Sequence, residues 1–171
     1  MKHTISVLVE NKFGVLARIA GLFSARGFNI TSLAVGETED PTTSRMTIVV
    51  EGDDKTLEQI KKQLNKLIDV IKVADFKEGE FIDREIILIK VAVSAKTRKE
   101  ILEAVEAAGG TIENAGSKSL TVELAGDQNS IKTMLELLKP FGIIEMARTG
   151  RIAMSISDKG LHGEGKPEVN E

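Results

Sequence analysis

Apolar and polar residues alternate along several short stretches of this chain, and such alternation predicts half-buried β-strands. The first half of the chain has four of these stretches, at residues 4–9, 29–35, 45–51 and 69–76. Between them, apolar residues recur with helical spacing at residues 15–26 and 56–66. The predicted order is therefore strand, helix, strand, strand, helix, strand, which is the order of a ferredoxin-like βαββαβ fold.

The same order of elements is predicted again in the second half, starting about 80 residues after the first. Strands are expected at residues 85–94, 111–115, 119–124 and 143–156, and helices at residues 97–108 and 129–139. Gly109 and Pro140 follow these helices, where each residue type commonly ends a helix. The predicted fold class is α+β, with two tandem ferredoxin-like domains. In each domain two helices would cover one face of a four-stranded antiparallel sheet.

Charged segments that contain glycine mark the expected domain boundaries. We expect a first domain at residues 1–78, a linker at residues 79–84 and a second domain at residues 85–158, because the join is polar and includes Gly79. Residues 159–171 are rich in Gly, Glu and Lys and are predicted to form a disordered tail.

Composition excludes several classes of protein. The 171 residues carry a net charge of −3, so attraction to nucleic acid or to an anionic membrane is not expected. The absence of cysteine excludes disulfides, thiolate catalysis and cysteine metal sites. No apolar run approaches the roughly 20 residues of a membrane-spanning helix. The first strand begins so early that no signal peptide is expected, and the predicted location is the cytoplasm.

The residues that an enzyme or an RNA-binding domain would need are also missing. The two histidines, His3 and His162, lie near opposite ends of the chain and in no cluster. An independent active site is therefore not expected. RNA-binding domains with the βαββαβ order stack bases on aromatic residues of their central strands, whereas this chain has six Phe, no Trp and no Tyr. Of the classes of protein considered, the sequence leaves a regulator that senses a ligand or binds another protein.

The corner between the first strand and the first helix is the candidate ligand site. It contains Asn11 and Gly14, and the helix begins at Val15. The first N–H groups of a helix are unpaired and lie at the positive end of its dipole, an arrangement that favours a carboxylate. Gly14 would let a ligand or a second backbone approach closely. The spacing leaves a structural alternative open, in which Asn11 caps the helix or forms a turn and Gly14 and Asn29 only form turns.

The residues around this corner resemble those of the regulatory, or small, subunits of acetohydroxyacid synthase, also called acetolactate synthase. The matching motifs are Glu10-Asn11-x-x-Gly14-Val15-Leu16-x-Arg18-Ile19, Gly21-Leu22-Phe23-Ser24-x-Arg26-Gly27-Phe28-Asn29-Ile30-x-Ser32-Leu33 and Asp40-Pro41-Thr42-x-Ser44-Arg45-Met46-Thr47. The resemblance implies that residues 1–78 form an ACT domain, the small-molecule-sensing module of amino-acid metabolism, which binds an effector and dimerises. One departure is Phe13, where many ACT loops have proline.

The resemblance also implies a function. A non-catalytic regulatory subunit would activate a large catalytic subunit and confer feedback inhibition by valine in branched-chain amino-acid biosynthesis. The large subunit joins two 2-oxo acids and would carry thiamine diphosphate, Mg²⁺ and FAD, so no cofactor is expected in this chain. The alternative is a stand-alone ACT-type amino-acid sensor that regulates another enzyme or a transcription factor.

The expected effector is valine or a related branched-chain amino acid, bound near the interface of a homodimer. The candidate effector-binding residues are Asn11, Gly14, Val15, Leu16, Asn29 and Ile30. The effector carboxylate would accept hydrogen bonds from the N–H groups of Gly14, Val15 and Leu16. Its ammonium group would donate to the side-chain carbonyl of Asn11 or Asn29, and its side chain would lie against Val15, Leu16 and Ile30. In the family's arrangement both protomers contribute to each site.

Two further features support contact with other chains. A four-stranded sheet of this kind has exposed edges that must be paired or protected. Leu8 and Leu33 are expected to add apolar surface beyond the helix-covered face, which favours a homodimer of the first domain. For Arg45 two interpretations stay open, namely contact with the catalytic subunit and pairing with a local carboxylate.

Overall fold

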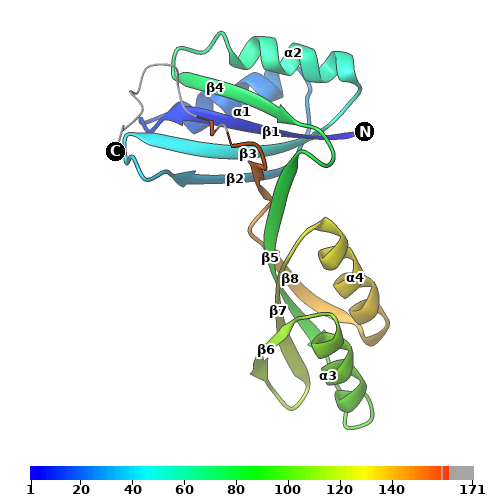
Figure 1. Cartoon of the computed structure of the whole chain (residues 1–171). Helices are drawn as coiled ribbons and strands as arrows, with labels where there is room; N and C mark the ends of the chain where they lie inside the picture. Colours follow the sequence, from blue (N-terminus) through cyan, green and yellow to red (C-terminus); the bar gives the residue numbers. More distant parts are fainter. Residues whose placement is uncertain (159, 162–171) are drawn as a thin grey trace. The chain divides into compact units, whose positions relative to one another are not determined.

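The structure is a computed structural model that describes residues 1–158, 160 and 161. It contains two compact units, and Figure 1 labels helices α1–α4 and strands β1–β8. Unit 1 comprises Met1–Ile82 and the chain from Arg151 onward, and unit 2 comprises Asp83–Gly150. Both units have the predicted βαββαβ order, so the predicted α+β fold class is confirmed. No helix among the described residues is both long enough and apolar enough to span a bilayer.

Unit 1 is an antiparallel sheet with two helices on one face. Its elements are β1 (Lys2–Glu10), α1 (Val15–Ala25), β2 (Ile30–Glu37), β3 (Thr43–Glu51), α2 (Asp54–Leu64) and β4 (Val70–Phe76). The strand order is β2-β3-β1-β4, which leaves β2 and β4 at the edges. Asp53 caps α2 by accepting a hydrogen bond from the N–H of Thr56 at 2.7 Å.

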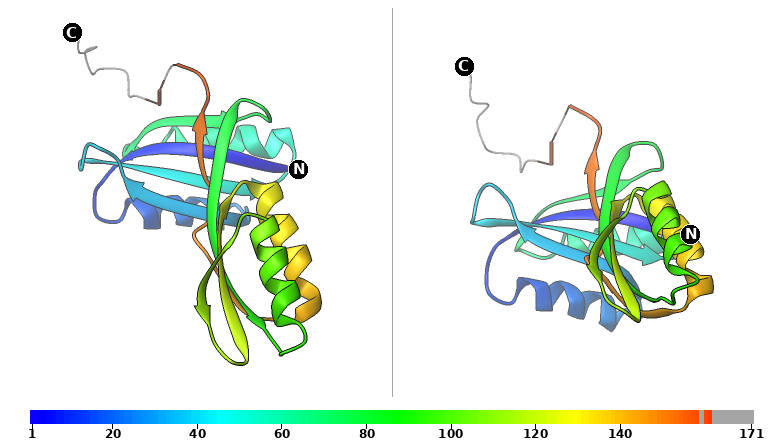
Figure 2. Two further views of the ribbon diagram at one scale, coloured as in Figure 1. Left: turned by 60° about the horizontal axis from the view of Figure 1, so that its bottom comes forward. Right: turned by 90° about the horizontal axis from the view of Figure 1, so that it is seen from below.

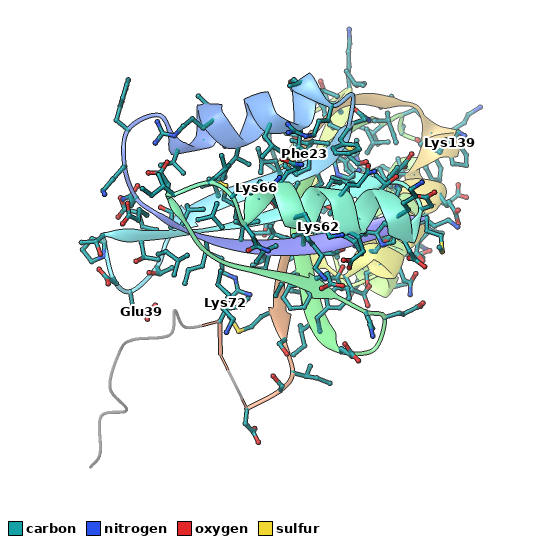
Figure 3. The ribbon with its side chains drawn as sticks, turned by 90° about the horizontal axis from the view of Figure 1, so that it is seen from above. Phe23, Glu39, Lys62, Lys66, Lys72 and Lys139 are labelled. Carbon is teal, nitrogen blue, oxygen red and sulfur yellow. The ribbon has the colours of Figure 1, made fainter. Side chains whose placement is uncertain are left out.

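The core of unit 1 lies between these helices and the sheet. Val7 is opposite Met46 and Ile5 is opposite Ile48, so the alternating apolar residues of β1 and β3 share one face. The helices add apolar side chains at helical spacing, among them Phe23, which is fully buried and is labelled in Figure 3. Lys62, also labelled there, is an exposed residue of α2.

One prediction about this sheet is wrong. Leu33 pairs with Ile48 and lies on the helix-covered face, where it packs against the core, and not on the opposite face. The cause is an irregularity in the pairing between Ile30 and Ser32, which inserts one residue and reverses the alternation. Leu8 does lie on the opposite face, as predicted, but it is buried.

The second face of the unit 1 sheet is covered by chain from the far end of the sequence. Strand β9 (Ile152–Ser155) lies against β1 and β3, and it pairs with β5 (Phe81–Ala92). Figure 2 shows α1 on one side of the sheet and the orange-red β9 on the other. Unit 1 therefore has three layers, with helices on one face of its sheet and β9 on the other.

Polar side chains of the sheet hold the backbone of β9. Arg45 donates from Nη2 to the carbonyl oxygen of Ala153 at 2.9 Å and from Nε to Ser6 Oγ at 2.9 Å. The N–H of Ala153 donates to Thr47 Oγ1 at 3.3 Å. Burial lowers the pKa of the Arg45 guanidinium. Among the described residues, the partners of Arg45 are therefore neutral oxygens, so it does not pair with a local carboxylate.

Arg151 adds two more hydrogen bonds at the start of this strand. Its N–H donates to Ser32 Oγ at 2.9 Å, and its Nη1 donates to Thr4 Oγ1 at 3.3 Å. Buried polar groups must be hydrogen-bonded, and the chain at β9 supplies partners for the hydroxyl groups that it covers. These hydrogen bonds hold β9 on the sheet of unit 1.

Unit 2 repeats the arrangement with its own core. Its elements are the main part of β5, α3 (Arg98–Ala107), β6 (Thr111–Ala115), β7 (Ser119–Gly126), α4 (Gln128–Leu138), the short 3₁₀ helix η1 (Lys139–Phe141) and β8 (Ile143–Arg148), in the strand order β6-β7-β5-β8. Asp127 caps α4 through the N–H of Ser130, and this hydrogen bond lowers the pKa of the Asp127 carboxyl. Glu85 is buried and accepts two hydrogen bonds from Arg148, at 2.7 and 2.6 Å.

The boundaries of the units differ from the expected division. The expected linker, residues 79–84, includes the start of β5, because Phe81 stacks on Phe76 of β4 with ring centroids 5.2 Å apart. The expected last strand, residues 143–156, is divided at Gly150, which has a φ of 83°. Its second part, β9, belongs to unit 1 and not to the expected domain 85–158. In the predicted tail, residue 159 and residues 162–171 lie outside the described part of the chain.

The attachment of β9 can be tested by Thr47→Val. This change keeps the size of the side chain but leaves the N–H of Ala153 without its acceptor, so the free energy of unfolding of unit 1 should fall by about 1–2 kcal/mol. Urea unfolding would measure the difference. The control is Thr31→Val, at an exposed position of β2, which should stay within roughly 0.5 kcal/mol of the parent. Equal stability of all three proteins would contradict the anchoring role of Thr47.

Candidate effector site

Gly14 gives the corner between β1 and α1 its shape. It stands immediately before α1 with φ 80° and ψ −2°, in the left-handed region that is strained for residues with a Cβ. No side chain in the described part of the chain caps the helix. A Cβ at Gly14 would lie 3.3 Å from Arg18 Nη1. The backbone conformation therefore favours glycine here, and a Cβ would also lie close to a cationic side chain.

Two of the three predicted backbone donors are available at the start of α1. The N–H of Val15 already donates to the carbonyl oxygen of Lys12, at a long N–O distance of 3.3 Å. Within the described part of the chain, the N–H groups of Gly14 and Leu16 have no hydrogen-bond partner. These two groups lie at the positive end of the helix dipole, where a carboxylate is stabilised.

Asn11 connects the corner to the loop between β2 and β3. Its Nδ2 donates to Glu37 Oε1 and to the carbonyl oxygen of Pro41, both at 2.9 Å. Its backbone N–H donates to the carbonyl oxygen of Thr42 at 2.7 Å. The alternative that Asn11 caps α1 is therefore wrong. With the amide nitrogen directed to these oxygens, Asn11 Oδ1 is left to accept a hydrogen bond from a ligand.

A cationic side chain lies beside the unpaired N–H groups. Arg18 donates to Asp69 Oδ2 from Nε at 2.9 Å and from Nη2 at 2.6 Å, which directs its Nη1 toward Gly14. Asp69 is buried, so this ion pair fixes the guanidinium. Lys12 pairs with Glu10 at 2.5 Å, and the hydrogen bond to Glu10 raises the pKa of Lys12. No group of three potential metal-binding side chains is found among the described residues.

Arg18 is not among the residues expected at the site, because an arginine on the polar side of a helix is usually solvated. A signal was present in the spacing, since Arg18 follows Gly14 by four residues and so lies one turn along the same face. The acidic residue that holds it, Asp69, is distant in sequence and only the fold brings it near.

The apolar candidates differ in their availability to a ligand. Val15 is 3% exposed and belongs to the core, whereas Leu16 is 44% exposed. Phe13 and Val35 are also exposed on this side of unit 1. An aliphatic ligand at the corner can therefore contact Leu16 but not the buried side chain of Val15.

The remaining candidates lie at the opposite end of α1. Asn29 is exposed and Ile30 is half-buried, and both follow the helix, whereas Gly14 precedes it. Because α1 has 11 residues, its two ends are about 16 Å apart at 1.5 Å per residue. The sheet register agrees, since Ile30 pairs with Val50 at one end and Glu37 pairs with Ser44 at the other. Within one chain, the two groups of predicted site residues do not come together.

The geometry defines the class of protein as a tandem ferredoxin-like α+β protein whose first unit has an ACT-type strand–loop–helix corner. Residues 5–72 match the family model described as the AHAS small subunit-like ACT domain, and residues 84–157 match the model of the small subunit of acetolactate synthase. The chain belongs to the acetolactate synthase small-subunit family.

Individual relatives agree over almost the whole length. A probable acetolactate synthase small subunit of Archaeoglobus fulgidus is 51% identical over 159 residues, which are 93% of this chain and 99% of the relative. An acetolactate synthase small subunit of Mycobacterium bovis is 50% identical, over 93% and 95% of the two chains. The crystal structure of the acetolactate synthase small subunit of Thermotoga maritima superposes with a TM-score of 0.84 at 40% identity, over 93% of this chain and 99% of that chain.

Proposed function

We propose that this chain is the regulatory subunit of an acetolactate synthase, which activates a large catalytic subunit and inhibits it when valine or a related branched-chain amino acid binds. The small-subunit names of the relatives support the existence of a catalytic partner. The regulatory subunit itself would be non-catalytic and cytoplasmic. Thiamine diphosphate, Mg²⁺ and FAD would bind to the partner, and family membership favours this function over that of a stand-alone sensor.

The effector would bind at the corner between β1 and α1. Its carboxylate would accept hydrogen bonds from the free N–H groups of Gly14 and Leu16, next to the guanidinium of Arg18. Its ammonium group would donate to Asn11 Oδ1. Its aliphatic side chain would lie against Leu16. One chain alone thus supplies the polar half of the site and one apolar wall.

The observation that carries the proposal is the separation of the candidate residues along α1. A second protomer can supply Asn29 and Ile30, because β2 is an edge strand with one unpaired side. If β2 pairs antiparallel with its copy across a two-fold axis, the Ile30 end of one strand meets the Glu37 end of the other. Asn11 bonds to Glu37, so the Asn29 side chain of the second protomer would approach the corner.

Such a dimer would also remove exposed apolar surface. Leu16 and Val35 are both more than 40% exposed, although each lies on the helix side of unit 1. Pairing the β2 edges would cover them and complete the apolar wall of the effector site. Effector binding and dimer geometry would then be coupled.

Calorimetric titration with valine, leucine and isoleucine tests the effector. At least one of them should bind, with one site per protomer. A parallel assay measures the activity of the purified large subunit with and without this chain. Binding of an amino acid without any change in that activity would favour the stand-alone sensor and contradict the proposed function.

The dimer interface can be tested with Val35→Asp. A charge buried without a partner at a protein interface is unfavourable. We therefore expect the dissociation constant of the dimer, measured by sedimentation or light scattering, to rise on the order of 10- to 100-fold. Ile68→Asp is the matched control, because Ile68 is 95% exposed on a loop of the same unit. A parent protein that is strictly monomeric at micromolar concentration would refute the dimer itself.

Gly14→Asp should abolish tight binding of the effector. The new carboxylate would repel the effector carboxylate and would pair with Arg18, which then no longer faces the ligand. Gly14→Asn is the control, because it has nearly the same size and tolerates the left-handed conformation equally well. We expect valine to bind Gly14→Asp at least tenfold more weakly than Gly14→Asn, a difference of about 1.4 kcal/mol. Parental affinity of Gly14→Asp for valine would place the site elsewhere.

A mixed dimer separates a shared site from a site within one chain. Asn29→His should weaken effector binding because it removes the amide and crowds the pocket. In a dimer of one Gly14→Asp chain and one Asn29→His chain, a shared arrangement places both changes in one site and leaves the other intact. Differently tagged chains allow purification of this dimer, and calorimetry should show one remaining site of parental affinity. Loss of both sites would contradict the shared arrangement, and parental affinity of the Asn29→His homodimer would show that Asn29 takes no part in the site.

A further inference from the structure

Four large apolar side chains form an exposed row on the outer side of unit 1. They are Ile82 of β5, Ile152 and Met154 of β9, and Ile156 directly after β9, and they are 53%, 58%, 63% and 59% exposed. Strands β5 and β9 pair, and the N–H of Ile156 donates to the carbonyl oxygen of Glu80 at 3.2 Å. Figure 2 shows the orange-red β9 beside the beginning of the green β5. We call these four residues the outer row.

The strands that carry the outer row are fixed against the sheet. Alternating with the row are Phe81, which stacks on Phe76, and Ala153, which is 6% exposed and is hydrogen-bonded to Arg45 and Thr47. Because side chains of a strand alternate between its two faces, these inner contacts direct the row outward. The row therefore belongs to the ordered fold of unit 1.

Its composition indicates a contact surface. A strand with one face on a core and one face in water usually carries polar side chains on the wet face. Here the outward residues of β9, Ile152 and Met154, are large and apolar, and so is the neighbouring Ile82 of β5. Contiguous exposed apolar surface in an otherwise ordinary domain marks a binding site for another molecule.

Two occupants that this chain could itself supply fit poorly. Residues 162–171 read His-Gly-Glu-Gly-Lys-Pro-Glu-Val-Asn-Glu, with one aliphatic residue, which is too few to cover four large side chains. The dimer proposed above buries the β2 edge and the α1 side of unit 1, whereas the row lies beyond the opposite face of the sheet. A closed two-fold dimer uses one self-complementary patch, so this dimer leaves the row to a different partner.

We propose that the outer row binds the large catalytic subunit of the synthase, through an apolar surface on that subunit. The proposal rests on the proposed function, which supplies this partner, and it adds the part of the small subunit that meets it. Interfaces owe most of their affinity to a few large side chains at their centre, and Met154 is the most exposed member of the row, with Ile152 and Ile156 on either side along the strand.

The test compares the variants Ile152→Asp and Met154→Asp with two controls. Met154→Leu keeps an apolar side chain in the row, and Ile68→Asp adds the same charge at an exposed loop position of unit 1. Each full-length protein is titrated into the purified large subunit from the same source, and the concentration for half-maximal activation is measured. We expect this concentration to rise on the order of 10- to 100-fold for the two row variants and to stay parental for both controls.

Further measurements separate the possible outcomes. Circular dichroism and valine calorimetry should give parental results for the row variants, since the row lies apart from the effector corner. Half-maximal activation at the parental concentration would overturn the proposal. Conversion of the row variants to monomers would also overturn it, because the row would then be a contact between copies of this chain. Failure of the parent protein to activate the large subunit would instead refute the proposed function. The outer row would then also lose its proposed partner.

Discussion

The length of α1 is the constraint on which the effector site depends. The helix separates Gly14 before its start from Asn29 after its end by about 16 Å, and its apolar side packs into the core of unit 1. A free amino acid spans only a few ångströms, so it cannot reach both ends of one helix. The corner of one chain offers N–H groups, an amide oxygen and a guanidinium, but its accessible apolar side chains, such as Leu16, are open to solvent. In the proposed dimer, a second chain would enclose the aliphatic side chain of the ligand.

In such a shared site, effector binding would depend on how the two protomers associate. If two protomers share each ligand, the ligand stabilises the arrangement in which their β2 edges meet, and that arrangement in turn raises the affinity for the ligand, by the same factor. The coupling needs no moving part inside unit 1. It needs only that the separated chains or a different relative orientation bind the ligand less well, since a ligand shifts an equilibrium only by its difference in affinity between two states.

Much of the fold follows from local sequence, because alternation and helical spacing identify nearly every element. Leu33 lies on the face opposite to the predicted one because one extra residue at Thr31 reverses the alternation, and nothing in the local pattern marks such an irregularity. The return of β9 to unit 1 depends on hydroxyl groups of β1, β2 and β3 that are distant in sequence. At the site, Gly14 was identifiable from its turn chemistry, whereas the role of Arg18 depends on Asp69, which only the fold brings within reach.

Strand β3 connects the two regions of unit 1 that carry the functional proposals. At its beginning, the carbonyl oxygen of Thr42 accepts the N–H of Asn11 from the effector corner. Three residues further, about 10 Å along a strand, Arg45 holds the carbonyl oxygen of Ala153 beneath the outer row. Both contacts are hydrogen bonds to backbone, so a shift of β3 relative to β1 would alter both. Strand β3 therefore links the proposed effector corner to the backbone that supports the outer row.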